Sequence, residues 1–360
     1  MTDSKDELLD ATTALVPVLM STLDALAYVG RHLHPPELPA LAGALEGFGE
    51  HVHKARAAFA GVAWPEPLAG FRDQVLRVAD EVEKALTGIT ASVDDPNGVY
   101  QAYRAMRHTT RAVETLYPLA AALPPVSRFF VDAERREDQA LLAQIAAGDG
   151  SRDDVGVLHA DNERGMRGGV SVYVPEYYDS TGSWPLIVAL HGGSGHGADF
   201  LWTWLREART RGCILMSPTS VDGTWSLNQP ERDVPRLIER IERAKAHWSI
   251  DPERVLLTGM SDGGTMSLMC GILGEGPWTH LAPISGSFHP MVMAAARDIR
   301  GLPIYLVHGA LDWMFPVAMA QSARDALAAA GARVTYREID DLSHTYPRDE
   351  NPKILDWFLA

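Results

Sequence analysis

Three side chains that could together cleave an acyl bond follow one another along the chain: Ser261, Asp312 and His344. A serine hydroxyl is a poor nucleophile at neutral pH and needs a base within hydrogen-bond reach, and a histidine base needs an acid to orient it. Each of the three comes just after a run of residues typical of a strand. Because parallel strands bring their carboxyl ends to one edge of a sheet, we expect the three side chains to meet there.

The nucleophile is predicted at Ser261, in the turn GMSDG at residues 259–263, between an expected strand and an expected helix. Glycines permit a sharp turn in which the backbone of the serine is strained and neighbouring chains approach closely. Such a turn would hold the Ser261 hydroxyl above the edge of the sheet. It would also place it at the N-terminus of a helix, whose dipole favours developing negative charge.

Asp312 is predicted to be the acid and His344 the base, each on a loop after a strand. Asp341, in the same loop as His344, is a second candidate acid, although it is too close along the chain to be the obvious partner. His289 is another histidine that could reach the serine from a neighbouring loop, and His308 is expected to be a structural hydrogen-bonding residue.

The glycine-rich turn HGGSGHG, residues 191–197, is a candidate site for the oxyanion of the reaction. Its exposed N–H groups suit a tetrahedral oxyanion, and the residue after the nucleophile usually supplies a second donor. We therefore expect one backbone N–H group of this turn to act together with the backbone N–H group of Asp262. The turn lacks the lysine of a Walker phosphate loop and a GxGxxG frame, which disfavours phosphate binding. Trp225 and Trp313 are candidate walls of a substrate pocket.

Residues from about 157 to 360 resemble the α/β-hydrolase superfamily, and within it the phospholipase/carboxylesterase-like and polyhydroxybutyrate-depolymerase-like serine esterases. The matching pieces are VSVYVPE, LIVALHGGSG, VLLTGMSDGG, LVHGALDWMFPV and DLSHTYP. The resemblance implies an α/β fold with a doubly wound, mostly parallel sheet. It also implies Ser261 as nucleophile, Asp312 as acid and His344 as base, with oxyanion donors near Gly193 and Asp262.

Such a site would hydrolyse small-molecule carboxylic esters through an acyl-enzyme intermediate and would need no metal or organic cofactor. Two alternatives stay open. The same triad could serve an acyl thioesterase or a lysophospholipase, or the chain could be a catalytically silent hydrolase-fold protein that binds partners or forms oligomers. No CxxC or HExxH spacing points to a metal site.

Residue composition and hydrophobic periodicity divide the chain into two expected domains, an all-α helical bundle at residues 1–150 and the catalytic α/β domain at residues 151–360. Pro17 is expected to kink or split the first helix, because proline removes a backbone donor and crowds the preceding turn. A Gly- and Asp-rich linker is expected at residues 146–156. Helices are predicted at residues 4–31, 37–60, 67–88, 96–122 and 125–147, and strands at residues 168–175, 185–191, 212–217, 253–259, 279–285, 302–308 and 333–339.

Composition narrows the partners and the location. The net charge of -15 over 360 residues disfavours nucleic acid and anionic membrane surfaces. No uncharged apolar stretch approaches the roughly 18 residues of a spanning helix. The acidic first residues are unlike a signal peptide, so we expect a cytoplasmic protein without stable membrane insertion. Cys213 and Cys270 are expected to be buried thiols. Because the expected catalytic domain has no cap insertion, we expect the helical bundle to cover the site or to form a homodimer.

Overall fold

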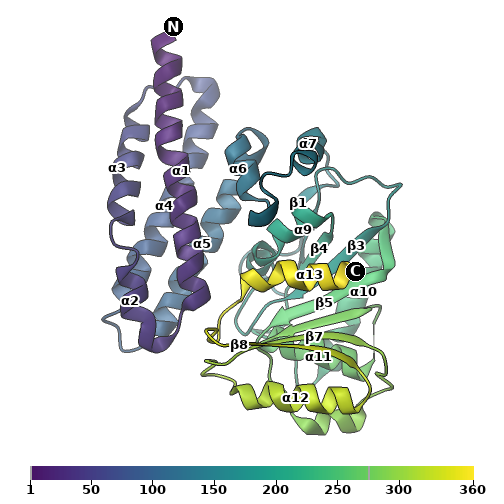
Figure 1. Cartoon of the computed structure of the whole chain (residues 1–360). Coiled ribbons are helices and arrows are strands. Elements are labelled where there is room, and N and C mark those ends of the chain that lie inside the picture. The colour runs from purple at the N-terminus through teal and green to yellow at the C-terminus, as the bar shows by residue number, and fades with distance from the viewer. Residues whose placement is uncertain (1, 275) are drawn as a thin grey trace. The chain divides into compact units, whose positions relative to one another are not determined.

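The computed structural model describes residues 2–274 and 276–360, and the chain divides into two compact units, Met1–Phe130 and Val131–Ala360 (Figure 1). The first unit is helical, as expected, and its long helices lie side by side as a bundle. Its helices are α1 (Thr2–His32), α2 (Leu38–Gly43), α3 (Phe48–Gly61), α4 (Ala69–Ser92), α5 (Gly98–Leu116) and α6 (Pro124–Phe129), with 3₁₀ turns at Pro35–Glu37, Glu66–Leu68 and Tyr117–Ala121.

Helix α1 packs through buried side chains that recur at intervals of three and four residues, which is the spacing of one helical face. Along this face lie Leu15, Leu19, Thr22, Leu26 and Val29. Residues 5–32 form the one helix in the described part of the chain that is long and apolar enough to cross a membrane. Burial of the leucines of this face in the bundle accounts for part of this apolar character.

Pro17 does not split the first helix, because α1 continues through it, and a kink at this residue stays a prediction. Pro17 is exposed, and so is Thr13, whose carbonyl would have accepted the missing N–H bond. Water can satisfy that carbonyl, so the helix tolerates the proline on its outer face. The break comes instead within the predicted helix 37–60, where Gly47 adopts a φ of 84° between α2 and α3.

The second unit contains an eight-stranded sheet in the order β1-β2-β4-β3-β5-β6-β7-β8. β2 is antiparallel to β1 and β4, and the remaining neighbours are parallel. The strands are β1 (Gly156–Ala160), β2 (Val170–Val174), β3 (Trp184–Leu190), β4 (Ile214–Pro218), β5 (Ile250–Met260), β6 (His280–Ile284), β7 (Pro303–Gly309) and β8 (Arg333–Ile339). This is the mostly parallel sheet that the sequence predicts.

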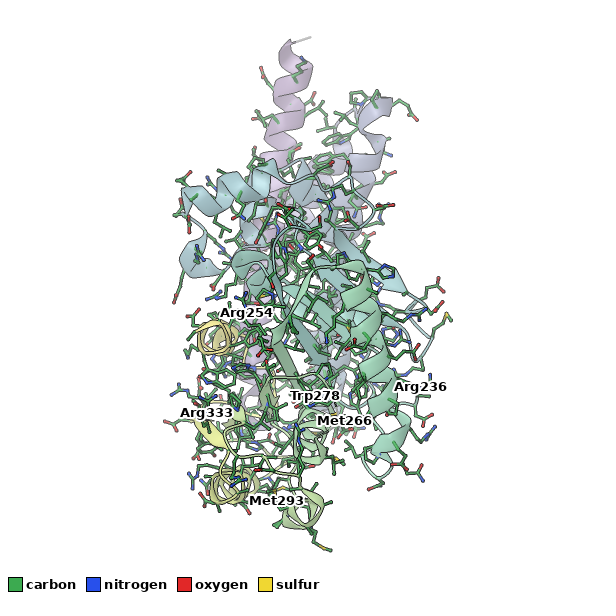
Figure 2. All side chains as sticks on the ribbon, turned by 90° about the vertical axis from the view of Figure 1, so that its right-hand side faces the viewer. Arg236, Arg254, Met266, Trp278, Met293 and Arg333 are labelled. Carbon is green, nitrogen blue, oxygen red and sulfur yellow. The ribbon has the colours of Figure 1, made fainter. Side chains whose placement is uncertain are left out.

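Helices cover both faces of this sheet. Alternate strand residues such as Leu186 and Val188 form one core with α10, α11 and α12, which includes the buried Met266 and Trp278 (Figure 2). On the other face Phe358 of α13 packs against His280. The helices of this unit are α7 (Gln139–Ala147), α8 (Gly197–Phe200), α9 (Leu205–Arg211), α10 (Val234–His247), α11 (Asp262–Leu273), α12 (Val317–Ala329) and α13 (Asn351–Leu359).

All seven predicted strands are present, and the structure adds β1. It begins at Gly156, the last residue of the expected linker, and is short and partly exposed at the edge of the sheet. An edge strand of this kind lacks the continuous apolar run by which the buried strands were recognised. Cys213 and Cys270 are buried thiols, as expected.

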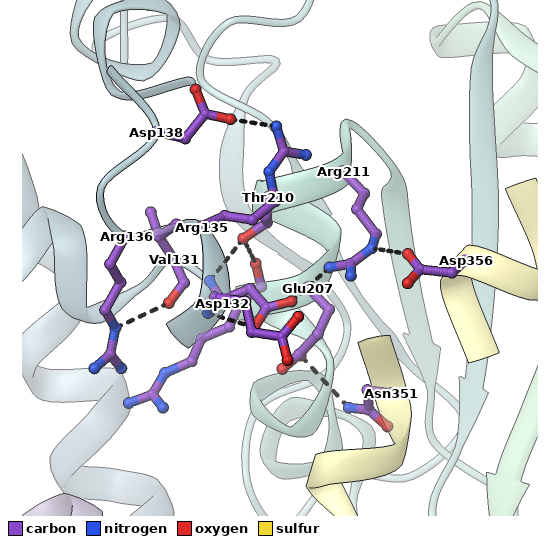
Figure 3. Close-up of polar contacts among 12 residues, drawn as sticks. Val131, Asp132, Arg135, Arg136, Asp138, Glu207, Thr210, Arg211, Asn351 and Asp356 are labelled. Atoms are coloured by element: carbon purple, nitrogen blue, oxygen red, sulfur yellow. Dashed lines mark hydrogen bonds and ion pairs between the residues drawn. The ribbon is translucent and has the colours of Figure 1, made fainter. Parts of the chain in front are cut away.

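The boundary between the units lies at Phe130–Val131, before the linker expected at residues 146–156. The difference has a physical basis in the contacts of residues 131–147. Leu141 and Ile145 of α7 pack with Val131, and the Asp132 backbone N–H donates to the Thr210 hydroxyl at 2.8 Å. Arg211 forms ion pairs with Asp132 at 2.7 Å and Asp356 at 3.0 Å (Figure 3), so this segment is bound into the second unit.

Candidate active site

Ser261 occupies a strained turn between β5 and α11, with φ 57° and ψ -122°. Few residues other than glycine adopt this region, and such strain persists only where surrounding contacts enforce it. The glycines beside the serine provide the space. A Cβ atom on Gly263 would overlap the Leu190 carbonyl oxygen, and one on Gly259 would stand 2.5 Å from the Gly263 carbonyl oxygen. The Ser261 N–H donates to Ile284 O at 3.0 Å, which ties the turn to β6.

His344 connects Ser261 to Asp312. Its Nδ1 atom lies 2.8 Å from Asp312 Oδ2, and its Nε2 atom lies 3.0 Å from Ser261 Oγ. An ionised carboxylate only accepts hydrogen bonds, so Nδ1 carries the proton and the Nε2 lone pair accepts the serine O–H. The chain of hydrogen bonds therefore has the polarity required for His344 to take the proton of Ser261.

Asp312 is held in its charged form by its surroundings. Its side chain is fully buried, and burial by itself raises the pKa of a carboxyl group. Hydrogen bonds from His344 and from the Phe315 N–H outweigh that effect and leave the pKa of Asp312 below its ordinary value. The Oδ1 atom accepts from the N–H groups of Met314 at 3.0 Å and Phe315 at 2.8 Å.

Phe315 is a positioning residue that sequence reasoning missed. Besides its N–H bond to Asp312, its carbonyl accepts from Nε2 of His308 at 2.8 Å. Its ring packs edge-on against the His344 ring, with centroids 5.2 Å apart. No sequence pattern distinguishes this phenylalanine from other apolar residues that follow an acid on a loop. His308 is the structural hydrogen-bonding residue that the sequence suggests, fully buried and 3.6 Å from Asp312 Oδ2.

The other histidine considered in the sequence does not contact the serine. His289 is exposed, and its Nδ1 atom accepts the Met291 N–H at 3.2 Å in a 3₁₀ turn, Pro290–Ala295. Asp341 is not the hydrogen-bond partner of His344 Nδ1, since Asp312 occupies that position. Within the residues that the structure describes, no group of three or more His, Cys, Asp or Glu side chains could hold a metal ion.

Hydrogen bonds within the glycine turn leave few of its N–H groups for a substrate. Ser194 N–H donates to Gly223 O at 2.9 Å, and Gly195 N–H donates to Gly192 O at 3.0 Å. The Gly193 N–H has no backbone acceptor in the described part of the chain. Asp262 begins α11, so its N–H has no partner within the helix. These two groups, predicted as oxyanion donors, belong to segments in direct contact, because a Cβ atom on Gly193 would lie 2.9 Å from Asp262 Oδ2.

Neutral His191 supports the glycine turn. It accepts the Ser220 N–H on Nε2 at 3.1 Å, and Nδ1 donates to Gly192 O at 2.7 Å. Burial lowers the pKa of His191 to about 4, so the ring stays uncharged. The Trp225 indole N–H donates to the His191 carbonyl at 2.7 Å.

The two tryptophans expected at the pocket differ in their positions. Trp225 is 3% exposed and stacks on His191, which gives it a supporting part under the turn instead of a surface for substrate. Trp313 is half-buried on the loop that carries Asp312. Its neighbours Leu311 and Met314 are exposed by 43% and 38%, so this loop offers apolar surface next to the acid.

Comparison with known proteins agrees with this fold. Residues 226–358 match the family model described as Phospholipase/Carboxylesterase. A curated relative, the bifunctional acetylxylan esterase/xylanase XynS20E of Neocallimastix patriciarum, is 28% identical over 155 residues, which make up 42% of this chain and 22% of that protein. The chain thus spans about a fifth of the length of this relative.

Two solved structures illustrate the structural similarity. A thermostable esterase is 20% identical, with 57% of this chain and 62% of that chain covered and a TM-score of 0.46. The apo form of Thermogutta terrifontis esterase 2 is 15% identical, with 57% of this chain and 94% of that chain covered and a TM-score of 0.46. The segment matched by the family model runs from the loop after β4 into α13 and contains Ser261, Asp312 and His344. The second unit thus has the fold of an α/β hydrolase and contains, at residues 226–358, the segment that matches the phospholipase/carboxylesterase family model; the helical bundle precedes it in the chain.

Proposed function

We propose that this chain is a serine hydrolase that cleaves carboxylic esters through a covalent acyl-enzyme. The observation that carries the proposal is a pair of hydrogen bonds made by His344, one to Ser261 Oγ at 3.0 Å and one to the buried carboxylate of Asp312 at 2.8 Å. These distances allow proton transfer without rearrangement of the side chains.

In the first half of the proposed reaction, Ser261 Oγ attacks the carbonyl carbon of the ester while His344 Nε2 takes the hydroxyl proton. Asp312 keeps the imidazole in the required tautomer and stabilises the imidazolium that forms. The N–H groups of Gly193 and Asp262 would donate to the carbonyl oxygen as it becomes negative. His344 then gives its proton to the departing alcohol, and the acyl group remains on Ser261.

In the second half, water attacks the acyl carbon and gives a proton to His344 Nε2, and collapse of the intermediate returns the proton to Ser261 and releases the acid. Apart from the ester and water, these steps use only groups of the chain itself. The same steps would hydrolyse a thioester, so an acyl thioesterase or lysophospholipase activity stays an alternative. The name of the curated relative adds acetylated xylan as a substrate to test.

The test is hydrolysis of p-nitrophenyl esters from acetate to palmitate, of an acyl thioester and of acetylated xylan, by wild type and Ser261→Ala. We expect ester hydrolysis that is lost in the variant, and labelling of Ser261 by a fluorophosphonate probe. Hydrolysis that survives in a folded variant would place the nucleophile elsewhere. A wild type that neither turns over an ester nor reacts with the probe would favour the silent binding protein.

The helical extension and the location belong to the same proposal. We infer that the bundle either limits access to the site or forms a homodimer, because the catalytic unit brings only a short 3₁₀ turn, Pro290–Ala295, between β6 and β7. Light scattering of the full chain measures the oligomeric state, and a monomer would exclude the dimer. The cytoplasmic location stays a prediction, which fractionation of cells would test.

A further inference from the structure

The proposed mechanism of ester hydrolysis does not use the side-chain carboxylate of Asp262. Its Oδ2 atom accepts a hydrogen bond from the Thr224 hydroxyl at 2.6 Å. The same oxygen would stand 2.9 Å from a Cβ atom on Gly193. The side chain therefore lies between the loop after β4 and the glycine turn, one residue from the nucleophile. Only the backbone N–H of Asp262 enters the proposed mechanism, so the charge of its side chain needs an explanation.

This charge lies in the first turn of α11, where the helix dipole favours it, but no charged side chain in the described part of the chain is paired with it. The hydrogen bond from Thr224 is the one polar contact of the Asp262 carboxylate, and no Lys, Arg or His side chain is paired with it. The second oxygen, Oδ1, accepts no hydrogen bond from the described residues. It is also not one of the buried polar atoms without a partner, so it is accessible to solvent. The residue is half-buried. An open, charged oxygen thus stands beside the glycine turn.

An unpaired negative charge at this place opposes the reaction. Attack by Ser261 puts negative charge on the carbonyl oxygen, which the N–H groups of Gly193 and Asp262 would hold. Like charges repel, and they repel more strongly in a partly buried site than in water. A positive group on the substrate removes the repulsion and gains a charge-assisted hydrogen bond to Oδ1. A neutral hydroxyl gains a hydrogen bond but leaves the charge in place.

We propose that Asp262 is a specificity-determining residue that binds a protonated amine of the substrate through its carboxylate. The preferred substrates are then esters with an ammonium group close to the ester carbonyl, of which α-amino acid esters are the simplest. This inference rests on the proposed esterase function. The net charge of -15 acts in the same direction, because it favours the approach of cations. The Thr224 hydroxyl has the role of holding the carboxylate in place, since it occupies Oδ2 and leaves Oδ1 for the ligand.

The test uses three ethyl esters of nearly equal size, those of L-alanine, L-lactate and propionate, which carry an ammonium, a hydroxyl and a hydrogen at the same carbon. The value of kcat/KM is measured for each at about pH 7, where an α-amino group with a pKa of about 7.7–8.0 is mostly protonated. An ammonium group also activates the carbonyl chemically, in wild type and variant alike. We therefore take kcat/KM for the alanine ester over kcat/KM for the propionate ester, and compare this alanine-to-propionate ratio between wild type and Asp262→Asn. The control variant is Asp340→Asn, which removes an exposed carboxylate at the end of β8 and gives the same change in net charge.

We expect Asp262→Asn to lower the alanine-to-propionate ratio about 10- to 100-fold, the size of a hydrogen bond between charged groups. Hydrolysis of the propionate ester should rise in this variant, because the repulsion of the oxyanion is removed. Asp340→Asn should keep the ratio of wild type. A ratio that is equal in wild type and Asp262→Asn, or that falls as far in Asp340→Asn, would overturn the proposal. So would an equal preference for lactate and alanine that disappears in Asp262→Asn, because it would show recognition of a hydroxyl instead of a charge.

Failure of the esterase function itself gives a different result. If none of the three esters is turned over, the same ratio is taken from the rates at which Ser261 is labelled by two phosphonates that differ in one ammonium group. A cationic preference that needs Asp262 would support the inference, and equal rates would overturn it. A serine that reacts with neither phosphonate would refute the proposed function and the inference with it. If all three esters are turned over but wild type and Asp262→Asn have the same alanine-to-propionate ratio, the inference alone is refuted.

Discussion

Replacing Asp312 by asparagine tests the polarity of the proposed triad with almost no change in shape. The Oδ1 atom of Asp312 accepts two N–H groups, from Met314 at 3.0 Å and Phe315 at 2.8 Å. An asparagine must keep its oxygen there, since its NH₂ group would face two donors. The NH₂ group then faces His344 Nδ1, which has to accept. As a result Nε2 carries the proton and cannot take one from Ser261.

The expected loss follows from this change of tautomer. Nucleophile, histidine and oxyanion donors all stay in place, but the histidine is held in the wrong form. We expect kcat/KM to fall by about 10³- to 10⁴-fold, which corresponds to about 4–5.5 kcal/mol of transition-state stabilisation. The KM should change little, because Asp312 is fully buried behind His344 and does not contact the substrate.

The assay is steady-state hydrolysis of the best p-nitrophenyl ester by wild type, Asp312→Asn and Asp341→Asn, with circular dichroism to establish that the variants fold. Asp341→Asn is the matched control, because Asp341 is the second candidate acid suggested by the sequence and lies in the same loop as His344. We expect its kcat/KM to stay within about threefold of wild type, as for a group outside the reaction. A loss below about tenfold in a folded Asp312→Asn, or an equal loss in Asp341→Asn, would refute the reasoning.

Three further substitutions, the last with a control, test buried groups of the second unit. Glu207 is buried, and burial raises its pKa, so the stability linked to its proton is fully present below the ordinary pKa of about 4.3 and is lost as the pH rises toward the pKa of the folded state. Glutamine does not titrate, so urea titrations should show Glu207→Gln becoming more stable relative to wild type from about pH 4 to pH 8. A difference that stays constant with pH would contradict this. Trp225→Phe removes the bond to the His191 carbonyl and should cost about 1–3 kcal/mol of unfolding free energy and lower kcat more than KM, whereas a change in KM alone would indicate contact with substrate. Gly263→Ala places a Cβ atom 2.5 Å from the His191 carbonyl oxygen and should abolish activity or folding. The control Gly49→Ala, whose Cβ atom meets nothing within 4 Å, should be neutral or stabilise the fold by up to about 1 kcal/mol. Equal melting temperatures of the two variants would refute the packing argument.

Most of the sheet could be predicted from the sequence because its strands are buried on both faces. Runs such as PLIVAL at residues 185–190 are apolar without alternation, and only a covered parallel strand needs that. The edge strand β1 lacks this signature and was missed. The end of the bundle was misplaced for a related reason. Residues 131–147 have helical composition, but their attachment to the second unit depends on Asp132 and Arg211, 79 positions apart in the chain.

The residues of the candidate triad could be predicted because their geometry depends on strand ends, which the apolar runs mark. Ser261, Asp312 and His344 each follow the strand after which they were expected. The supports of these residues could not be predicted in this way. Phe315 acts on Asp312 through its backbone N–H and on His344 through its ring, and neither contact leaves a pattern in the sequence.

The glycine turn shows most directly why an oxyanion donor cannot be chosen from sequence. HGGSGHG offers several similar N–H groups, and which of them remain for a substrate depends on acceptors elsewhere. The Gly223 carbonyl takes the N–H of Ser194, and the neighbouring Thr224 hydroxyl holds Asp262 against Gly193. The loop after β4 carries no catalytic motif, yet it leaves the Gly193 N–H available and fixes the carboxylate beside it. The proposed chemistry of the site therefore depends on this loop as well as on the candidate triad. Substitutions at Thr224 should accordingly alter the preference between esters, whereas those at Asp312 should lower the rate for every ester.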